Sequence, residues 1–333
     1  MQALFYNVEN NKVRCRLCPH HCLIGEGQTG LCRVRKNEQG VLVAENYGRL
    51  SSVHLDPIEK KPLYHFYPGR QILSVGSVGC NMRCAFCQNC EISQVGVHEF
   101  PWFKDVPVEQ LVARAKSINE NLGIAFTYNE PTIFYEYMLD VAREAHHQGL
   151  KCVMVTNGYI EAEPMETILP FIDAFNVDLK AFTDSFYRKQ THAHLAPVKE
   201  TLMRIRQAEK HLEITFLVIP GLNDSVEEFD AMTDWISNNL GQQTIFHLSK
   251  YFPQYHMARP ETPDATLLKL HELACRKLSY VYLGNVWSRL PGHNTECSNC
   301  KAVVIKRLGY DVETPGITAD GSCVHCENKV VER

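Results

Sequence analysis

From residue 71 to residue 283, short apolar runs alternate with segments whose apolar residues recur at helical spacing. Because the runs are apolar at nearly every position, they are typical of strands in a parallel sheet that helices cover on the outside. The six main runs and a shorter last one are residues 72–75, 123–128, 152–156, 174–179, 214–219, 244–248 and 280–283. Since crossovers between parallel strands are right-handed, the pattern predicts an α/β fold, a partial (β/α)6 TIM-like barrel open at one side.

The length and the net charge of the chain further limit the class of protein. The 333 residues leave room for such a barrel and for smaller attachments. The net charge of -4 comes from interspersed charges of both signs, which favours neither a nucleic-acid partner nor a membrane surface. No apolar stretch approaches the roughly 20 residues that a membrane helix needs, and the first residues lack a signal-peptide pattern. We therefore expect a cytoplasmic protein whose 14 cysteines bind metal rather than form disulfides.

Three cysteines lie close together after the first predicted strand. Cys80, Cys84 and Cys87 have the spacing C-x3-C-x2-C. Each thiolate can bind one iron of a cubane 4Fe-4S cluster, which leaves the fourth iron without a protein ligand. Such a cluster can pass an electron to a sulfonium bound beside it, and S-adenosyl-L-methionine (SAM) is such a sulfonium. The alternative is a zinc knuckle completed by Cys90 or a histidine, although structural zinc sites usually combine paired units.

With Phe86 before its last cysteine, this stretch resembles the signature of the radical SAM superfamily. The resemblance implies a radical SAM barrel with a 4Fe-4S cluster and SAM as cofactors. It further implies reductive cleavage of SAM to a 5'-deoxyadenosyl radical, which abstracts hydrogen from a substrate. The cofactor-binding residues that it suggests are Phe86, Asn129, Glu130, Asn157, Asp178, Lys180 and His247.

The polar residues of this set follow the carboxyl ends of predicted strands, where parallel α/β folds place their sites. Tyr128-Asn129-Glu130-Pro131 resembles the second motif of the superfamily, often Gly-Gly-Glu-Pro, whose backbone and Glu meet the methionine amino group. Tyr128 and Asn129 depart from the small glycines of that motif, so the role carries over more safely to Glu130. Taken alone, Asn-Glu-Pro is also an ordinary start of a helix.

Later strand ends supply the other candidates. Asn157 lies in Thr-Asn-Gly, which is similar to a turn that closes the ligand pocket in activating enzymes of glycyl-radical proteins. Asp178 and Lys180 point the same way from their strand, so Asp178 could bind the ribose or amino group and Lys180 the carboxylate of SAM. A salt bridge at the rim is the alternative. His247 resembles a histidine that contacts SAM in the pyruvate formate-lyase activating enzyme, although a lone strand histidine is more often a core residue.

Two groups of four cysteines flank the barrel. They are Cys15, Cys18, Cys22 and Cys32, and Cys297, Cys300, Cys323 and Cys326. The first group could bind zinc or an auxiliary iron-sulfur cluster, and its spacing does not decide between them. The second group has two C-x2-C units and is typical of a zinc ribbon, although a rubredoxin-like iron site is an alternative. Metal would replace a large core in both modules.

These groups suggest three domains. We expect a metal or iron-sulfur module at residues 1–50, the barrel at 51–290 and the second module at 291–333. Residues 56–69 contain three prolines and predict an extended loop that lines the barrel mouth or packs on its rim. Cys152 and Cys275 stand alone and are interpreted as buried small hydrophobes.

Nearly the whole chain resembles one branch of the superfamily, the pyruvate formate-lyase activating-enzyme-like group, and within it the enzymes of the AmmeMemoRadiSam system. The features are the leading Cys-x-x-Cys-Pro-His, residues 57–63, the stretches around Cys80 and Cys87, and the four-cysteine tail. Cys90 departs from the group, which usually has Trp there, and offers a fourth thiolate that could compete for the open iron.

The resemblance implies an activating-enzyme-like oxidoreductase that forms a glycyl radical on a partner protein and receives electrons from flavodoxin or ferredoxin. One alternative is modification of a small molecule together with Memo-like and AMMECR-like partners. Another is a non-catalytic iron-sulfur electron-transfer protein, which would leave the polar strand ends without a purpose.

Overall fold

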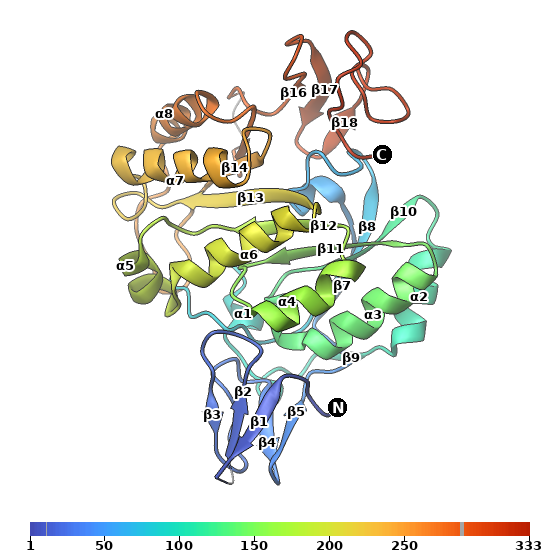
Figure 1. The fold of residues 1–333 in the computed structure, drawn as a ribbon, viewed down its shortest axis with the longest axis vertical. Helices are drawn as coiled ribbons and strands as arrows, with labels where there is room; N and C mark the ends of the chain where they lie inside the picture. The colour runs from blue at the N-terminus through green and yellow to red at the C-terminus, as the bar shows by residue number, and fades with distance from the viewer. Residues whose placement is uncertain (11, 287–289) are drawn as a thin grey trace.

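The computed structural model describes residues 1–333 except residue 11 and residues 287–289, and its centre is an eight-stranded sheet (Figure 1). In spatial order the strands are β7 (Ser52–Pro57), β8 (Gln71–Gly76), β10 (Asn121–Phe126), β11 (Lys151–Thr156), β12 (Ala174–Asp178), β13 (His211–Val218), β14 (Ile245–Lys250) and β15 (Tyr280–Gly284). Strands β8 to β15 of this sheet run parallel, and β7 pairs antiparallel with β8. Within the described chain β7 and β15 do not pair, so the barrel is open. This confirms the predicted partial barrel and adds the last apolar run to it as β15.

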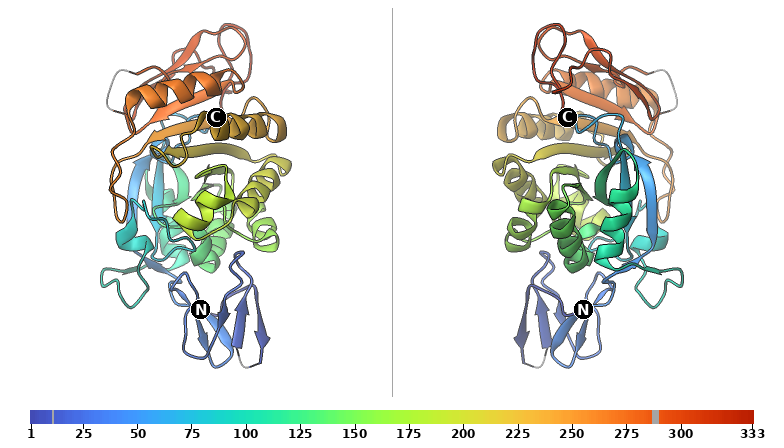
Figure 2. Two further views of the ribbon diagram at one scale, coloured as in Figure 1. Left: turned by 90° about the vertical axis from the view of Figure 1, so that its left-hand side faces the viewer. Right: turned by 90° about the vertical axis from the view of Figure 1, so that its right-hand side faces the viewer.

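Helices cover the outside of the barrel, as the two side views show (Figure 2). The longer ones are α2 (Val108–Ser117), α3 (Tyr135–His147), α4 (Ala162–Ile168), α6 (Leu195–Gln207), α7 (Val226–Asn239) and α8 (Asp264–Cys275). The shorter ones are η1 (Ile58–Lys60), α1 (Cys90–Ser93), η2 (Pro131–Phe134), η3 (Leu169–Phe171), α5 (Asp184–Phe186) and η4 (Tyr187–Thr191). Ser225 caps the start of α7, and its Oγ accepts a hydrogen bond from the Glu228 amide in a capping-box sequence. Among the described helices we find none with the length and apolarity of a membrane span.

Residues 58–67 close the amino-terminal end of the barrel. Ile58, Leu63 and Phe66 are buried against the first residues of several strands, including Ile72 and Ala174. This segment therefore lies at the end opposite the loops that follow the strands. Of the two alternatives for this segment, lining the mouth of the barrel was wrong. Packing on the barrel rim is confirmed, at the amino-terminal end, where Phe66 and its apolar neighbours are buried.

The N-terminal segment forms two small antiparallel units. One has strands β1 (Tyr6–Glu9), β2 (Lys12–Cys15) and β3 (Leu23–Ile24), and the other is the hairpin of β4 (Arg35–Glu38) and β5 (Val41–Ala44). Strand β6 (Arg49–Leu50) then pairs with β9 (Lys104–Asp105). The His20 ring bonds the Asn81 carbonyl at 2.7 Å, and the Glu161 amide donates to the Leu17 carbonyl at 3.1 Å. The N-terminal segment thus packs on loops that follow β8 and β11, at the carboxyl end of the barrel.

The C-terminal segment packs on the other end, and Figure 1 shows the two segments at opposite extremes of the molecule. Its strands are β16 (Thr295–Glu296), β17 (Val303–Leu308) and β18 (Asp311–Glu313). Arg307 donates to the Tyr64 carbonyl at 2.7 Å, and the Glu332 amide donates to the His65 carbonyl at 2.8 Å. The tail therefore holds the segment that closes the amino-terminal end, the side of such barrels where residues serve stability.

Candidate active site

The loop after β8 carries the three closely spaced cysteines and is held rigidly. Gly79 has a φ of +85°, and a Cβ there would lie 2.5 Å from the carbonyl oxygen of Cys32, so glycine is required. The amides of Arg83 and Ala85 donate to two carbonyl oxygens of η4 at 2.8 and 2.9 Å. These bonds fix the backbone on both sides of Cys84.

The sulfur of Cys80 has two nitrogen donors nearby. The Met82 amide lies 3.3 Å from Sγ, and the Asn157 side-chain amide lies 3.7 Å from it. Burial raises the pKa of all three thiols, and it raises the pKa of Cys84 to about 12. The thiols therefore stay protonated at neutral pH unless a metal displaces the protons.

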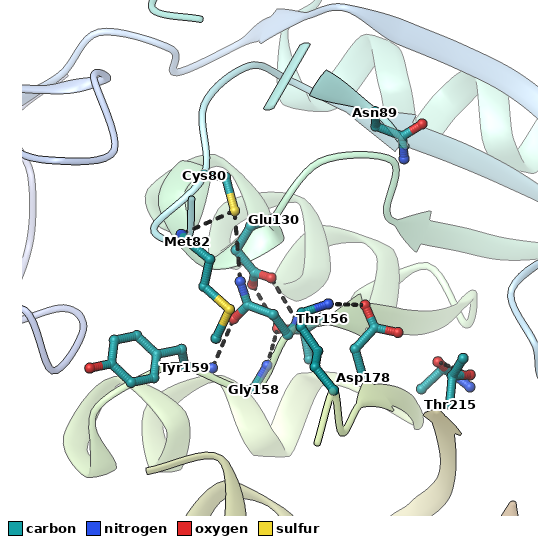
Figure 3. Close-up of polar contacts among 12 residues, drawn as sticks. Cys80, Met82, Asn89, Glu130, Thr156, Gly158, Tyr159, Asp178 and Thr215 are labelled. Atoms are coloured by element: carbon teal, nitrogen blue, oxygen red, sulfur yellow. Dashed lines mark hydrogen bonds and ion pairs between the residues drawn. The ribbon is translucent and has the colours of Figure 1, made fainter. Parts of the chain in front are cut away.

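Glu130 joins the ends of β10 and β11 (Figure 3). Its Oε1 accepts hydrogen bonds from the Thr132 amide, the Thr132 hydroxyl and the Thr156 hydroxyl at 3.0, 2.6 and 2.6 Å. Its Oε2 accepts one from the Asn157 amide at 2.8 Å. Burial raises the pKa of this carboxyl, and the hydrogen bonds oppose that shift. Oε2 keeps a free lone pair for a further donor, such as an ammonium group.

Asn157 connects Glu130 to the cysteine loop. Its side-chain amide donates to Oδ1 of Asn81 at 2.9 Å, and its own Oδ1 accepts from the Tyr159 amide at 2.9 Å. Together with the contact to Cys80, these bonds fix the Asn157 side chain completely. The structure thus brings Cys80, Glu130 and Asn157 into one hydrogen-bonded group.

The two residues that depart from the glycine-rich motif point in different directions. Asn129 turns to the cysteine loop, where it accepts from the Ser77 amide at 2.9 Å and donates to the Gly79 carbonyl at 3.0 Å. Tyr128 has a φ of +71°, and its hydroxyl donates to Asp56 of β7. Tyr128 fits because Gly76 opposite has no side chain, and a Cβ there would lie 3.0 Å from that of Tyr128.

Asp178 and Lys180 form an ion pair of 2.9 Å between Oδ2 and Nζ at the end of β12. Burial alone would lower the pKa of Lys180, but the charge of Asp178 and the hydrogen bond to it outweigh burial and raise the pKa above its usual value. Lys180 therefore stays protonated and presents a positive charge beside the cysteine loop. The ring of Phe86 is buried in that loop and lies 5.9 Å from the ring of Phe186.

His247 is joined to a carboxylate that the sequence analysis missed. Its Nε2 lies 2.6 Å from Oε2 of the fully buried Glu213, whose Oε1 lies 2.8 Å from Nε2 of His211. The amides of Tyr64 and His65 also donate to Glu213. Burial alone would raise the pKa of Glu213, but the bonds from His211 and His247 outweigh it and lower the pKa. Glu213 thus occupies Nε2 of His247 and links it to residues 64–65 at the amino-terminal end, and no hydrogen bond among the described residues joins His247 to Glu130, Asp178 or the cysteine loop.

Comparison with known proteins decides the family, because residues 74–236 match the radical SAM superfamily. The chain belongs to this superfamily. An uncharacterized protein of Methanocaldococcus jannaschii is 41% identical over 99% of this chain and 98% of its own. The pyruvate formate-lyase-activating enzyme of Clostridium pasteurianum is 22% identical over 48% of this chain and 67% of its own. Streptococcus suis SuiB bound to S-adenosylmethionine shares the fold, with a TM-score of 0.51 and 15% identity over 64% of this chain and 52% of that chain.

The protein is therefore a radical SAM enzyme related to the activating enzymes, and its fold implies SAM and a 4Fe-4S cluster. The residues present fit both groups. Three thiols on one fixed loop can bind iron, and the donors at Cys80 are typical of cluster ligands. The free lone pair of Glu130 and the charge of Lys180 suit the amino and carboxylate groups of an amino acid.

The N-terminal and C-terminal groups of four cysteines are arranged differently. In the tail, the sulfurs of Cys297, Cys300, Cys323 and Cys326 all lie within 4.8 Å of one another. The distance from Cys297 to Cys326 is 3.5 Å, and that from Cys300 to Cys323 is 3.7 Å. Zinc-sulfur bonds of about 2.3 Å place the sulfurs of a tetrahedron about 3.8 Å apart, so the tail fits one metal ion. The N-terminal group surrounds a cavity instead, and Cys90 begins α1.

Proposed function

We propose that this radical SAM enzyme binds a 4Fe-4S cluster on Cys80, Cys84 and Cys87, binds SAM beside it, and abstracts hydrogen from a glycine of a partner protein. The observation that carries the proposal is the fixed three-cysteine loop at the carboxyl end of the barrel, hydrogen-bonded to Asn157. The similarity to a pyruvate formate-lyase-activating enzyme supports the choice of substrate class. When bound, the cluster supplies the electron that cleaves SAM into methionine and a 5'-deoxyadenosyl radical.

The residues of the chain orient SAM in this proposal. Lys180 pairs with the methionine carboxylate, and Glu130 accepts a hydrogen bond from the amino group at Oε2. Asp178 accepts a hydrogen bond from the ribose, and its side chain is 37% exposed and therefore accessible. His247 contributes through Nδ1, because Glu213 holds its other nitrogen.

Other side chains shape and preserve the site. Asn129 and Asn157 fix the position of the cysteine loop relative to the sheet, because each hydrogen-bonds the loop from the end of a neighbouring strand. Phe86 is buried and packs within the loop. A reductant of the flavodoxin or ferredoxin class would deliver the electron. The tail metal is structural in this proposal, because the tail lies at the opposite end of the barrel.

Anaerobic reconstitution with iron and sulfide, followed by reduction and addition of SAM, tests the proposal. We expect equal amounts of 5'-deoxyadenosine and methionine, and no product from Cys84→Ala. Cys275→Ser is the matched control, because Cys275 is exposed on α8. Cys90→Ser should keep the iron content and the activity, whereas loss of iron would make Cys90 a cluster ligand and contradict the open iron.

The substrate class needs a second experiment with deuterium-labelled candidates. Deuterium that moves from a partner protein's glycine into 5'-deoxyadenosine would support the activating-enzyme proposal. Deuterium that moves from a small molecule, with Memo-like or AMMECR-like proteins present, would overturn it in favour of the alternative. SAM cleavage that neither Cys84→Ala nor metal removal affects would refute the assignment of the site.

A further inference from the structure

The four N-terminal cysteines line one small, partly open cavity of about 20 Å³. Cys15 ends β2, Cys18 and Cys22 lie in the turn before β3, and Cys32 lies before β4. Their sulfurs come from different parts of the small fold and meet around this cavity. Cys15 and Cys32 are buried, and the other two are half-buried, so the cavity lies just beneath the surface.

This arrangement differs from that of the C-terminal tail. The tail sulfurs are as close together as the ligands of one tetrahedral ion. Among the described residues, no three of the N-terminal cysteines come within that distance of one another. A cubane cluster holds each cysteine on a different iron, so its four ligands lie further apart than those of a single ion. The wider sulfur spacing fits a cluster better than a single zinc ion.

A buried cation lines the same cavity. Arg35 is 1% exposed, and its Nη1 pairs with Glu136 at 3.0 Å, while its Nη2 donates to the Leu4 carbonyl at 2.6 Å. Its Nε is buried and has no hydrogen-bond partner within the described chain. An unpaired buried donor is costly, and it needs an acceptor that the protein itself does not supply. A sulfur of a bound cluster would be such an acceptor.

Four cysteines and one buried guanidinium that line the same cavity therefore make a site for an anionic cluster.

We infer that Cys15, Cys18, Cys22 and Cys32 bind a second 4Fe-4S cluster with a cysteine on every iron. With four protein ligands it has no open iron, so it cannot bind SAM and is restricted to electron transfer. It takes one electron from a low-potential reductant of the flavodoxin or ferredoxin class and gives one electron to the three-cysteine site. No bond is made or broken in this transfer.

The structure suggests the path of that electron. Asn81 lines the cavity and directly follows Cys80 in the chain. Its carbonyl oxygen bonds the His20 ring at 2.7 Å, and its side chain accepts from Asn157. One residue thus separates the second cluster from a ligand of the first. The relay role rests on the proposed function, whereas the presence of the second cluster does not.

The first test counts iron and sulfide in the full-length protein. The triple variant Cys80→Ala, Cys84→Ala, Cys87→Ala should retain one 4Fe-4S cluster after anaerobic reconstitution. The electron paramagnetic resonance signal of this cluster should not change when SAM is added. The single variant Cys22→Ser should keep a cluster whose signal changes on addition of SAM. Zinc without sulfide in the triple variant would overturn the inference. If the triple variant fails to fold, the wild-type protein is measured instead. Two electron paramagnetic resonance signals, of which SAM changes one, would support the second cluster. A single signal would overturn it.

The second test separates the relay from the proposed function. Cys22→Ser should cleave SAM with dithionite but lose at least about tenfold in rate with reduced flavodoxin, which corresponds to about 1.4 kcal/mol. Cys275→Ser is again the control. Equal rates with flavodoxin in Cys22→Ser and wild type would overturn the relay. Wild-type protein that holds two clusters but cleaves no SAM would refute the proposed function and leave the second cluster in place.

Discussion

Replacing Glu130 with glutamine tests how the site holds the turn after β11. Glu130 is buried and accepts three hydrogen bonds at Oε1 and one at Oε2, from the Asn157 amide. Glutamine can keep its carbonyl oxygen at the Oε1 position, but its NH2 group then faces the Asn157 N–H, donor against donor. A lost hydrogen bond to a charged acceptor costs about 1.5–3 kcal/mol. Because burial raises the pKa of Glu130, the neutral amide recovers part of this cost, and we expect a net loss of about 2 kcal/mol.

A loss of about 2 kcal/mol raises the population of the open turn about 30-fold. Amide hydrogen exchange, measured by mass spectrometry on the segment 155–160, should therefore accelerate by about that factor. Glu166→Gln on α4 is the matched control, since the Glu166 side chain is 66% exposed and the chemical change is the same. Exchange in Glu130→Gln that equals both the wild type and this control would refute the reasoning, because Glu130 would then not hold the turn.

Three further changes probe other parts of the account. Lys180→Met should raise the Kd for SAM at least about tenfold in equilibrium dialysis, since it removes the charge opposite the carboxylate, and an unchanged Kd would contradict this role. Gly76→Ala should cost about 1–3 kcal/mol in chemical unfolding, because its Cβ would lie 2.7 Å from the Thr127 carbonyl, and an unchanged midpoint would show that the strands can move apart. Burial lowers the pKa of His65 to about 3, so below pH 6.5 the unfolded chain binds a proton that the folded protein does not. From pH 6.5 to pH 5 wild type should lose about 2 kcal/mol more stability than His65→Gln, and parallel pH curves would refute this.

The parallel barrel could be predicted because its strands are buried on both faces and are therefore continuously apolar in the sequence. Strand β7 escaped prediction because it lies at an edge and contains only two fully buried residues, without the helix that accompanies a parallel strand. For residues 58–67 the sequence could not decide between the mouth and the rim of the barrel, for a different reason. Their prolines indicate an irregular path, but the side on which that path packs depends on distant strands.

The candidate site, too, could be predicted from the sequence only in part. The cysteines are found by spacing alone, because ligands of one cluster must lie close together in such a loop. Glu213 could not be assigned, since its partners come from residues 64–65, β13 and β14. A single carboxylate within an apolar strand was the only signal in the sequence. Cys275 was expected to be buried, yet it is exposed beside His271, because it lies on the outer face of α8, next to the buried Ala274.

The central claim is that the three-cysteine site holds a cluster with one iron that no side chain binds. Mössbauer spectroscopy of the reconstituted protein, before and after addition of SAM, tests it most directly. The account predicts that one iron of that cluster changes its spectrum when SAM binds, while the iron on the N-terminal cysteines does not. A spectrum that SAM leaves unchanged, or zinc in place of iron on Cys80, Cys84 and Cys87, would contradict it.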